Sequence, residues 1–480
     1  MNFVEDVLES FPAARPALVA IDADGNRRVW GFGELIARSA GLAGGLAARG
    51  VGRGDVVLTL IGNRPEWVLA MLACFRIGAV ALPCNTQLRR GDLAHRVDLA
   101  DPAIALGEAE LLGELPGSVP AMDLEELNLI LDEERPQEAP AEPADLAPSD
   151  PALIVFTSGT TGAARAAVHN QAYLTGQALQ AQRWFGAKDG ELSWCTAATG
   201  WSKSARNSFI APWLCGAAAL LCEGRFDAAE RLEICEREGV NVLCQAPTEY
   251  RMMAKRTELR PVPGLRRLVS AGEPLNPEVI GAFVDGVGLE INDGYGQTET
   301  GALTGAQPGR PVKPGSMGER LPGIDLRVDD GELILRPESC PTFFSHYIGS
   351  EPFDGEWWHT GDLVSEDEDG YLWFEGRADD VIVSSGYRIG PFEVESALVS
   401  HPAVAEAAAV AAPDAERGSI VRAIVVLRDG EAGEAMAREL QEHVKRETAP
   451  YKYPRVVEFA AELPKTASGK IRRAELRREG

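Results

Sequence analysis

A segment dense in glycine, serine and threonine, TSGTTGAARAAVH, spans residues 157–169 directly after the apolar run ALIVF at 152–156. Backbone N–H groups and hydroxyls in such a segment can close around phosphate oxygens where a strand ends. No Lys-Ser or Lys-Thr pair follows Gly162, so the segment is not the G-x-x-x-x-G-K-[ST] loop. It predicts a phosphate-binding loop, although on its own it is also typical of a polar turn.

A second polar segment, DGYGQTETG at 293–301, overlaps the end of the predicted strand LEINDGYG at 289–296. It groups hydroxyls, an amide and a carboxylate at the end of a parallel strand, where open α/β sheets bind ligands. Glu299 offers the carboxylate oxygen that Mg²⁺ prefers. A single glutamate in a glycine-rich turn is also commonly just solvated, and both interpretations stay open at this point.

Two later segments carry further candidate residues. In WWHTGDLVSEDEDGYLWFEGRADDVIVSSGYRIGPFEVESAL (357–398), Asp362 has acceptors suited to the paired hydroxyls of a ribose, and Arg377 and Arg388 bring positive charge. The acidic run 367–369 in the same segment is typical of a charged hairpin tip. Near the C-terminus, PKTASGKIRR (464–473) places Lys470 after a glycine, although a basic tail is most often only a solvated face.

Strands and helices must alternate to position these residues. Apolar spacing predicts helices at 32–50, 65–79 and 171–184, and strands at 55–63, 79–85, 152–156, 217–224, 241–247 and 265–274. Such alternation favours parallel sheets with covering helices, while the proline- and acid-rich stretch 134–150 indicates a surface connection. Short strands between about 312 and 376 indicate a small β-rich lobe.

Beyond Arg377 the pattern becomes a compact α+β one, with helices predicted at 391–401 and about 434–447. We therefore expect an α/β protein of two domains. A large N-terminal domain of parallel sheets at 1–376 includes the β-rich lobe, a hinge lies at 377–380, and a small mobile α+β domain occupies 381–480.

The chain carries 47 Lys and Arg against 72 Asp and Glu, a formal net charge of −25. Such a surface repels nucleic acid and anionic membranes, so neither is expected as a partner. The eight cysteines form no C-x-x-C pair, which predicts reduced thiols. No signal-peptide pattern and no apolar run near the ~20 residues of a membrane span are present, so we expect a cytoplasmic protein.

Taken in order, these motifs resemble the adenylate-forming superfamily of acyl-CoA synthetases, nonribosomal adenylation domains and luciferases. The chain is most similar to the medium-chain acyl-CoA synthetases, through TGW (199–201), SAGEPL (270–275), SSGYRIGPFEVESAL (384–398), APYKYPR (449–455) and PKTASGKIRR. The resemblance extends from about residue 25 to 478. It implies an enzyme that activates a carboxylic acid with Mg²⁺ and ATP and transfers the acyl group to coenzyme A.

The resemblance also implies roles for individual residues. Lys470 serves the first half-reaction, Thr298 contacts phosphate, Glu299 binds Mg²⁺ and Asp379 is the hinge residue. The loop departs from the family pattern, with Ala164 in place of Pro and Arg165 in place of Lys. The implied nucleotide-binding residues are Thr157, Ser158, Gly159, Thr160, Thr161, Gly162, Arg165, Gly272, Glu273, Pro274, Asp293, Gly294, Tyr295, Asp362 and Arg377. Arg388 is a further cofactor-binding candidate because of its positive charge. The implied coenzyme A residues are Ser385, Gly386, Arg417, Lys445 and Tyr453.

The acid is predicted from the residues expected around the acyl group. Acetyl- and propionyl-specific relatives carry a Trp where this chain has Gly296, so an open channel and a medium-chain or aromatic acid are expected. Trp201 is predicted to line this channel. Trp213 is a second candidate, with plain core burial as the alternative.

Three other functions compete with this one. The activated acyl group can pass to a carrier-protein thiol instead of free coenzyme A, light emission as in the luciferases has no support in these residues, and a catalytically lapsed nucleotide-binding homologue would bind ATP without releasing pyrophosphate. The expected partners are the small-molecule acid, ATP and coenzyme A. The sequence leaves the oligomeric state open, and a homo-oligomer is compatible with it.

Overall fold

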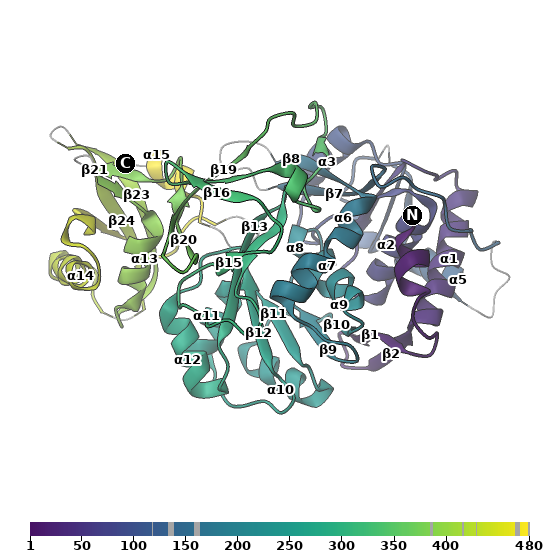
Figure 1. Ribbon diagram of the computed structural model, residues 1–480, viewed down its shortest axis with the longest axis horizontal. Coiled ribbons are helices and arrows are strands. Elements are labelled where there is room, and N and C mark those ends of the chain that lie inside the picture. Colours follow the sequence, from purple (N-terminus) through teal and green to yellow (C-terminus); the bar gives the residue numbers. More distant parts are fainter. Residues whose placement is uncertain are drawn as a thin grey trace.

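The computed structural model describes residues 1–117, 119–132, 139–157, 164–384, 387–414, 417–428, 430–465 and 471–478, with only the backbone at Arg388 and Arg478. Figure 1 shows a large α/β body that carries the N-terminus and a smaller C-terminal unit at the opposite end of the molecule. The body is built on two large sheets.

The larger sheet has nine strands in the order β15-β14-β13-β12-β11-β9-β10-β1-β2. Its six central strands, from β13 to β1, run parallel, and β14, β15 and β2 are antiparallel additions. The strands are β1 (Pro16–Ile21), β2 (Arg27–Gly31), β9 (Leu192–Cys195), β10 (Ala218–Cys222), β11 (Val242–Gln245), β12 (Arg267–Ala271), β13 (Ile291–Gln297), β14 (Gly301–Gly305) and β15 (Glu319–Arg320).

The second sheet has seven strands in the order β18-β8-β7-β4-β3-β5-β6. Strands β7, β4, β3, β5 and β6 are parallel, and β8 and β18 extend the sheet in antiparallel fashion. The strands are β3 (Val56–Leu60), β4 (Val80–Pro83), β5 (Ile104–Gly107), β6 (Ala121–Asp123), β7 (Pro151–Thr157), β8 (Arg165–Asn170) and β18 (His346–Tyr347).

Helices cover both sheets. Helix α2 (Pro65–Ile77) begins with a proline at its first position, and eleven of its residues are buried against α1 (Phe32–Ala48) and neighbouring strands. Helices α10 (Ala228–Glu238), α11 (Pro247–Arg256) and α12 (Pro277–Val287) pack on the larger sheet. The remaining helices of the body are η1 (Val4–Leu8), α3 (Arg90–Ala100), α4 (Ala109–Leu112), α5 (Leu124–Leu131), α6 (Gln171–Gly176), α7 (Ala178–Gln180), η2 (Ala181–Phe185), α8 (Ser202–Ala205), η3 (Arg206–Ile210), α9 (Ala211–Leu214) and η4 (Pro337–Ser339).

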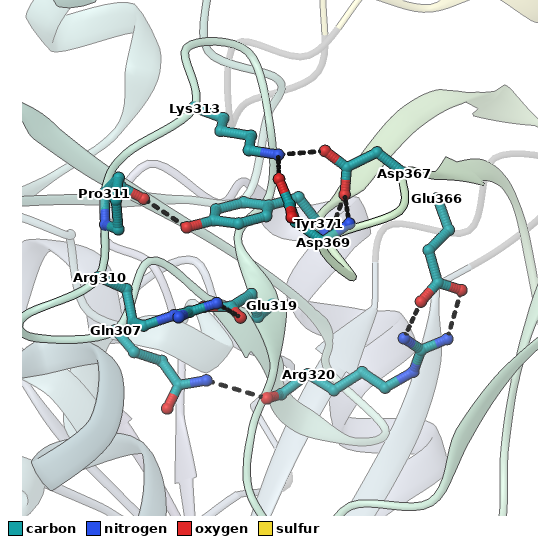
Figure 2. Close-up of polar contacts among 10 residues, drawn as sticks. All are labelled: Gln307, Arg310, Pro311, Lys313, Glu319, Arg320, Glu366, Asp367, Asp369 and Tyr371. Atoms are coloured by element: carbon teal, nitrogen blue, oxygen red, sulfur yellow. Dashed lines mark hydrogen bonds and ion pairs between the residues drawn. The ribbon is translucent and has the colours of Figure 1, made fainter.

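A four-stranded antiparallel sheet forms the β-rich lobe, from β16 (Leu326–Asp329), β17 (Glu332–Leu335), β19 (Trp358–Glu366) and β20 (Leu372–Arg377). The acidic turn at 367–369, between β19 and β20, contacts the loop that precedes β15, as Figure 2 shows. Lys313 binds Asp367 and Asp369 there, and the Tyr371 hydroxyl donates to the Pro311 carbonyl at 2.7 Å. The acidic run is therefore a charged hairpin tip, and it also anchors a loop.

The C-terminal unit has its own core. Helices α13 (Pro391–Ser400) and α14 (Glu434–Glu447) pack on a sheet of β23 (Val404–Asp414), β24 (Gly418–Leu427) and β25 (Val456–Phe459). A two-stranded hairpin of β21 (Ile382–Ser384) and β22 (Tyr387–Ile389) precedes them, and η5 (Pro450–Lys452) and α15 (Arg473–Arg478) complete the unit. The predicted α/β fold class is confirmed.

The structure differs from the prediction in three places. The single helix predicted at 171–184 is divided into α6, α7 and η2. Segment 312–376 supplies strands to both large sheets as well as to the lobe. The β1–β2 hairpin, which completes the larger sheet, was not predicted, although β1 is an apolar and mostly buried run. Among the described residues, none of the helices is both long and apolar enough to cross a membrane.

Candidate active site

A cleft of about 2670 Å³ lies between the body and the C-terminal unit. The carboxyl ends of β12 and β13 open into it, as expected for ligand sites of parallel sheets. Its described lining has more Lys and Arg than Asp and Glu, whereas the whole chain has 47 against 72. The cleft is therefore the locally basic part of an acidic protein, which suits anionic ligands.

A hydrogen-bonded network joins β13 to the lobe inside this cleft. Asp362 is 4% exposed and accepts from Tyr295 Oη at 2.5 Å, Gln297 Nε2 at 2.8 Å and Arg377 Nη1 at 3.1 Å. Gln297 and Arg377 also donate to the Thr360 carbonyl, at 2.7 and 3.1 Å. Burial raises the pKa of Asp362, against the effect of the Arg377 charge. Two predicted residues, Tyr295 and Arg377, thus both donate to a third, Asp362.

The segment after β12 forms a neighbouring wall. Gly272 has φ +101°, a conformation that favours glycine, and an ideal Cβ there would lie 3.4 Å from Lys203 Nζ. Glu273 accepts from Thr248 Oγ1 at 2.7 Å and Arg251 Nη2 at 2.9 Å. The predicted Pro274 also lines the cleft. This wall places a carbonyl-rich turn beside the end of β13.

Asp293 and Gly294 lie at the same edge. Asp293 is 5% exposed, its Oδ1 has no partner among the described residues, and burial raises its pKa well above the usual range. An ideal Cβ at Gly294 would lie 2.5 Å from Trp184 Nε1, so the close approach of that indole requires glycine.

The phosphate-loop prediction is described only at its flanks, because 158–163 lie outside the described residues and include Ser158, Gly159, Thr160, Thr161 and Gly162. Thr157 and Arg165 pair across β7 and β8 and both line the cleft. The Arg165 guanidinium lies over the Tyr347 ring, 3.3 Å from its centroid, and Tyr347 Oη donates to Glu299 Oε1 at 2.5 Å. Burial and then the Glu299 charge raise the pKa of Tyr347.

Thr298 and Glu299 line the cleft beside this contact. Among the described residues, no group of three or more His, Cys, Asp or Glu side chains is arranged to hold a metal ion. One carboxylate on Glu299 is still compatible with Mg²⁺, because Mg²⁺ often binds through one or two carboxylates together with substrate phosphates.

The C-terminal unit meets the cleft through α15 and the segment before it. Lys470 lies outside the described residues, and Ile471, next to it, lines the cleft. Arg477 donates to Asp380 at 2.6 Å and Arg473 to Glu395 at 2.7 Å, which docks α15 beside the predicted hinge. Asp379 contacts Arg377, with Nε and Oδ1 3.6 Å apart.

The predicted coenzyme A residues lie elsewhere. Ser385 and Gly386 are outside the described residues, and Arg388, of which only the backbone is described, pairs with Val383. Lys445 Nζ lies 4.2 Å from the Tyr453 ring centroid, and the exposed Arg417 donates its N–H to Asp414. Arg417, Lys445 and Tyr453 do not line the cleft. The structure therefore separates this group from the nucleotide candidates.

The acyl-channel predictions have mixed outcomes. Trp201 and Gly296 line the cleft. An ideal Cβ at Gly296, however, would lie 1.8 Å from the Gly301 carbonyl oxygen, so the β13–β14 contact requires glycine whatever the acid. Gly296 thus carries no argument about channel length. Trp213 is fully buried in the core and donates to the Ala17 carbonyl, so its expected alternative, core burial, applies.

Several contact residues were missed by the sequence reasoning. Gln297 belongs to a quoted motif, and its position next to Thr298 was the available signal. Tyr347 and Arg251 lie outside every motif. Tyr347 reaches Glu299 only because β18 pairs with β8, with Tyr347 opposite Ala167. Such a pairing has no signature in a two-residue strand.

Known proteins share this arrangement over its full length. Residues 4–341 match the family model described as AMP-binding enzyme, and 393–470 match the AMP-binding enzyme C-terminal domain. An uncharacterized acyl-CoA ligase of Bacillus subtilis (strain 168) is 39% identical over 508 residues, covering 99% of this chain and 96% of its own. The human mitochondrial acyl-coenzyme A synthetase ACSM4 is 38% identical over 521 residues, covering 99% and 90%.

Among solved structures, the anthranilate CoA ligase AuaEII in complex with anthranoyl-AMP is similar, with a TM-score of 0.88 and 29% identity, and the match covers 100% of this chain and 97% of that one. The first domain model alone covers more than half of the sequence, and both relatives span nearly the whole of it. The chain therefore belongs to the acyl-CoA synthetase family of AMP-binding enzymes, and it is an acid–thiol ligase.

Proposed function

We propose that this protein is an AMP-forming acyl-CoA synthetase that uses Mg²⁺-ATP and free coenzyme A. The carboxylate of the acid attacks the α-phosphorus of ATP, the bond to the bridging oxygen breaks, and pyrophosphate leaves. The thiol of coenzyme A then attacks the acyl carbon, and AMP leaves with the bonding electrons while the thiol proton passes to solvent. The observation that carries the proposal is the convergence of Tyr295, Asp362 and Arg377, from separate motifs, in one basic cleft.

In this proposal the described residues bind and orient the nucleotide. Asp362 accepts from the ribose hydroxyls, Arg377 neutralises Asp362, and the turn at 272–274 with Asp293 and Gly294 frames the adenine. Thr157, Thr298 and Arg165 face the phosphates, together with the loop residues that lie outside the described part. Arg165 is a planar fork rather than a point charge, and its stacking on Tyr347 fixes the plane of that fork.

Glu299 would hold Mg²⁺, because it lines the cleft. Tyr347 Oη donates to one of its carboxylate oxygens and so orients the carboxylate. Bound Mg²⁺ supplies charge neutralisation on the phosphates. Lys470 would place a cation near both the attacking carboxylate and the α-phosphate, two anions that otherwise repel each other. Removing one such preorganised group typically costs ~10²–10³ in rate.

The transfer to coenzyme A calls for a second arrangement of the C-terminal unit. We propose a body at 1–376, a hinge at 377–380 around Asp379 and a lid at 381–480. Rotation about the hinge would bring the hairpin that contains Ser385 and Gly386 toward the acyl group. Arg417, Lys445 and Tyr453 lie in the same unit and suit the phosphates and adenine of coenzyme A.

The acid is proposed to be medium-chain or aromatic. Trp201 lines the cleft and offers an aromatic face to the acyl group. Comparison of acetate, hexanoate, octanoate and benzoate tests this size range.

The deciding experiment measures AMP and pyrophosphate released from Mg²⁺-ATP by the purified chain, with and without coenzyme A, for each acid. Release that requires both the acid and coenzyme A supports the proposal. Acid-dependent acyl-AMP formation without use of coenzyme A would instead support a carrier-protein thiol as acceptor. ATP binding with no pyrophosphate from any acid would indicate a lapsed enzyme.

A further inference from the structure

The cleft is lined by a buried arginine, Arg206, that lacks an ion-pair partner among the described residues. Arg206 is 6% exposed, it lines the cleft, and its Nε and Nη1 atoms have no hydrogen-bond partner among the described residues. It also forms no ion pair with a described carboxylate. A buried, unpaired charge is expensive, so a site that keeps one normally supplies the missing anion as a ligand.

The neighbours of Arg206 do not neutralise it. His169, which is fully buried, feels the Arg206 charge, and burial followed by that charge lowers the pKa of His169 to about 3. His169 is therefore neutral at physiological pH. Tyr173 interacts with Arg206 through its hydroxyl, but burial raises the pKa of this phenol, so it stays neutral and supplies no counter-charge.

A second cation lies on the same helical face. Lys203 is three residues before Arg206, a spacing that puts two side chains side by side on a helix. Its Nζ donates to the Ala271 carbonyl at 3.0 Å and has no described carboxylate partner. The nearby Asp293 is a weak counter-charge, because burial raises its pKa.

Both cations follow Trp201, the residue assigned to the acyl group, along the consecutive helical segments α8 and η3, and all three residues line the cleft. Lys203 Nζ also adjoins Gly272, so this part of the cleft borders the turn assigned to the adenine. This region is distinct from the network around Asp362, which the ribose would occupy. A channel for a purely apolar acyl chain has no use for two unpaired cations on one wall, since they would face hydrocarbon.

Resting on the proposed function, we propose that the acid substrate carries a second anionic group, and that Arg206 and Lys203 bind this group at the far end of the acyl site. The substrate class is a dicarboxylic acid of medium length or with an aromatic core. One carboxylate is activated, and the other forms charge-assisted hydrogen bonds with the two cations. A buried site of this kind rejects an analogue that lacks the acceptor, because the donors are then left unpaired.

The test compares matched acids that differ only in the second carboxylate, namely hexanoate with adipate, octanoate with suberate and benzoate with terephthalate. The measurement is kcat/KM for pyrophosphate release with Mg²⁺-ATP and coenzyme A present. In the wild type we expect the diacid to be preferred by about 10- to 100-fold in at least one pair, the range of one or two hydrogen bonds to a charged group. Equal or better use of the monoacid in all three pairs would overturn the inference, and this comparison needs no variant.

Variants then assign the preference to its residues. Arg206→Met should lower kcat/KM for the preferred diacid and raise it for its monoacid partner, whereas R206K should keep part of the preference. The matched control is R183M, which removes an exposed arginine from η2 and should change neither value. Loss of stability in R206M with an unchanged acid preference would show that Arg206 is structural and would overturn its assignment. Pyrophosphate release from no acid at all would instead refute the proposed function, a separate outcome.

Discussion

Replacing Arg473 with methionine removes the cation that ties α15 to the core of the C-terminal unit. Arg473 Nη2 donates to both Glu395 oxygens, at 2.9 and 2.7 Å, and the Glu395 side chain is 8% exposed. The variant leaves Glu395 with the Ala409 N–H, at 2.8 Å, as its remaining described donor. The perturbation is therefore a buried carboxylate that has lost its counter-ion.

Removing one partner of a buried ion pair costs about 3–5 kcal/mol. Arg473 begins α15, so the cost weakens the docking of this helix and of the segment before it. A loss of about 3 kcal/mol lowers the docked population relative to the undocked one by about a hundredfold. Because α15 begins three residues after Lys470 in the sequence, we expect acid-dependent pyrophosphate release to fall by up to about the same factor. Attack of coenzyme A on supplied acyl-AMP should change by less than about threefold, since it does not use Lys470.

The assay measures the two half-reactions separately, as pyrophosphate release in the first and thioester formation from synthetic acyl-AMP in the second. The matched control is R472M. Arg472 is half-exposed and pairs only with Glu475 at 2.8 Å among the described residues, a surface pair worth little. Equal losses in both half-reactions of R473M, or equal effects of the two variants, would refute the reasoning.

Three further outcomes are expected. Asp362→Asn should raise the KM for ATP by about 10- to 100-fold with the fold intact, since Asn has one acceptor oxygen in place of two and no charge to pair with Arg377, and D354N on an exposed loop should not. In D293N the free energy of unfolding, measured by urea, should exceed that of the wild type by an amount that grows as pH rises above about 4, the usual pKa of an unfolded Asp. Burial raises the Asp293 pKa, so wild-type stability is full below the unfolded pKa and is lost as pH rises through the folded one. G296A should be destabilised by over about 1 kcal/mol, because its Cβ would overlap Gly301, whereas G281A in helix α12 has open space and should be stabilised.

The fold was predictable where local periodicity and tertiary packing agree. Helix α2 begins at Pro65 and ends before Gly78, which has φ +74°, and both residues are visible signals. The β1–β2 hairpin had a local signal, the Asp24-Gly25 turn between its strands, and this signal was missed. The place of β1 in the sheet was not predictable, because it pairs with β10, about two hundred residues later. Pairings of this range leave little trace in local sequence patterns.

The nucleotide part of the site was predictable for a related reason. Residues that follow neighbouring parallel strands lie at one edge of a sheet, so the motifs after β12 and β13 had to open toward the same cleft. The motif after β7 comes from the other sheet, and its place in this cleft depends on how the two sheets pack. Contacts between residues of separate sheets were not predicted. Tyr347 touches both Arg165 and Glu299, and it comes from a strand of two residues with no motif around it.

Arg206 shows why the acid cannot be named from motifs. In the sequence it precedes the apolar run at 209–214, where an isolated arginine reads as the edge of a helix that faces water. Only the packing of η3 shows that this guanidinium is buried, beside a neutral histidine and within one helical turn of Lys203. Burying this guanidinium without a counter-ion costs free energy, and a bound anion would offset that cost. The family motifs carry the residues proposed to bind the nucleotide, whereas the residue proposed to select the acid, Arg206, belongs to none of them.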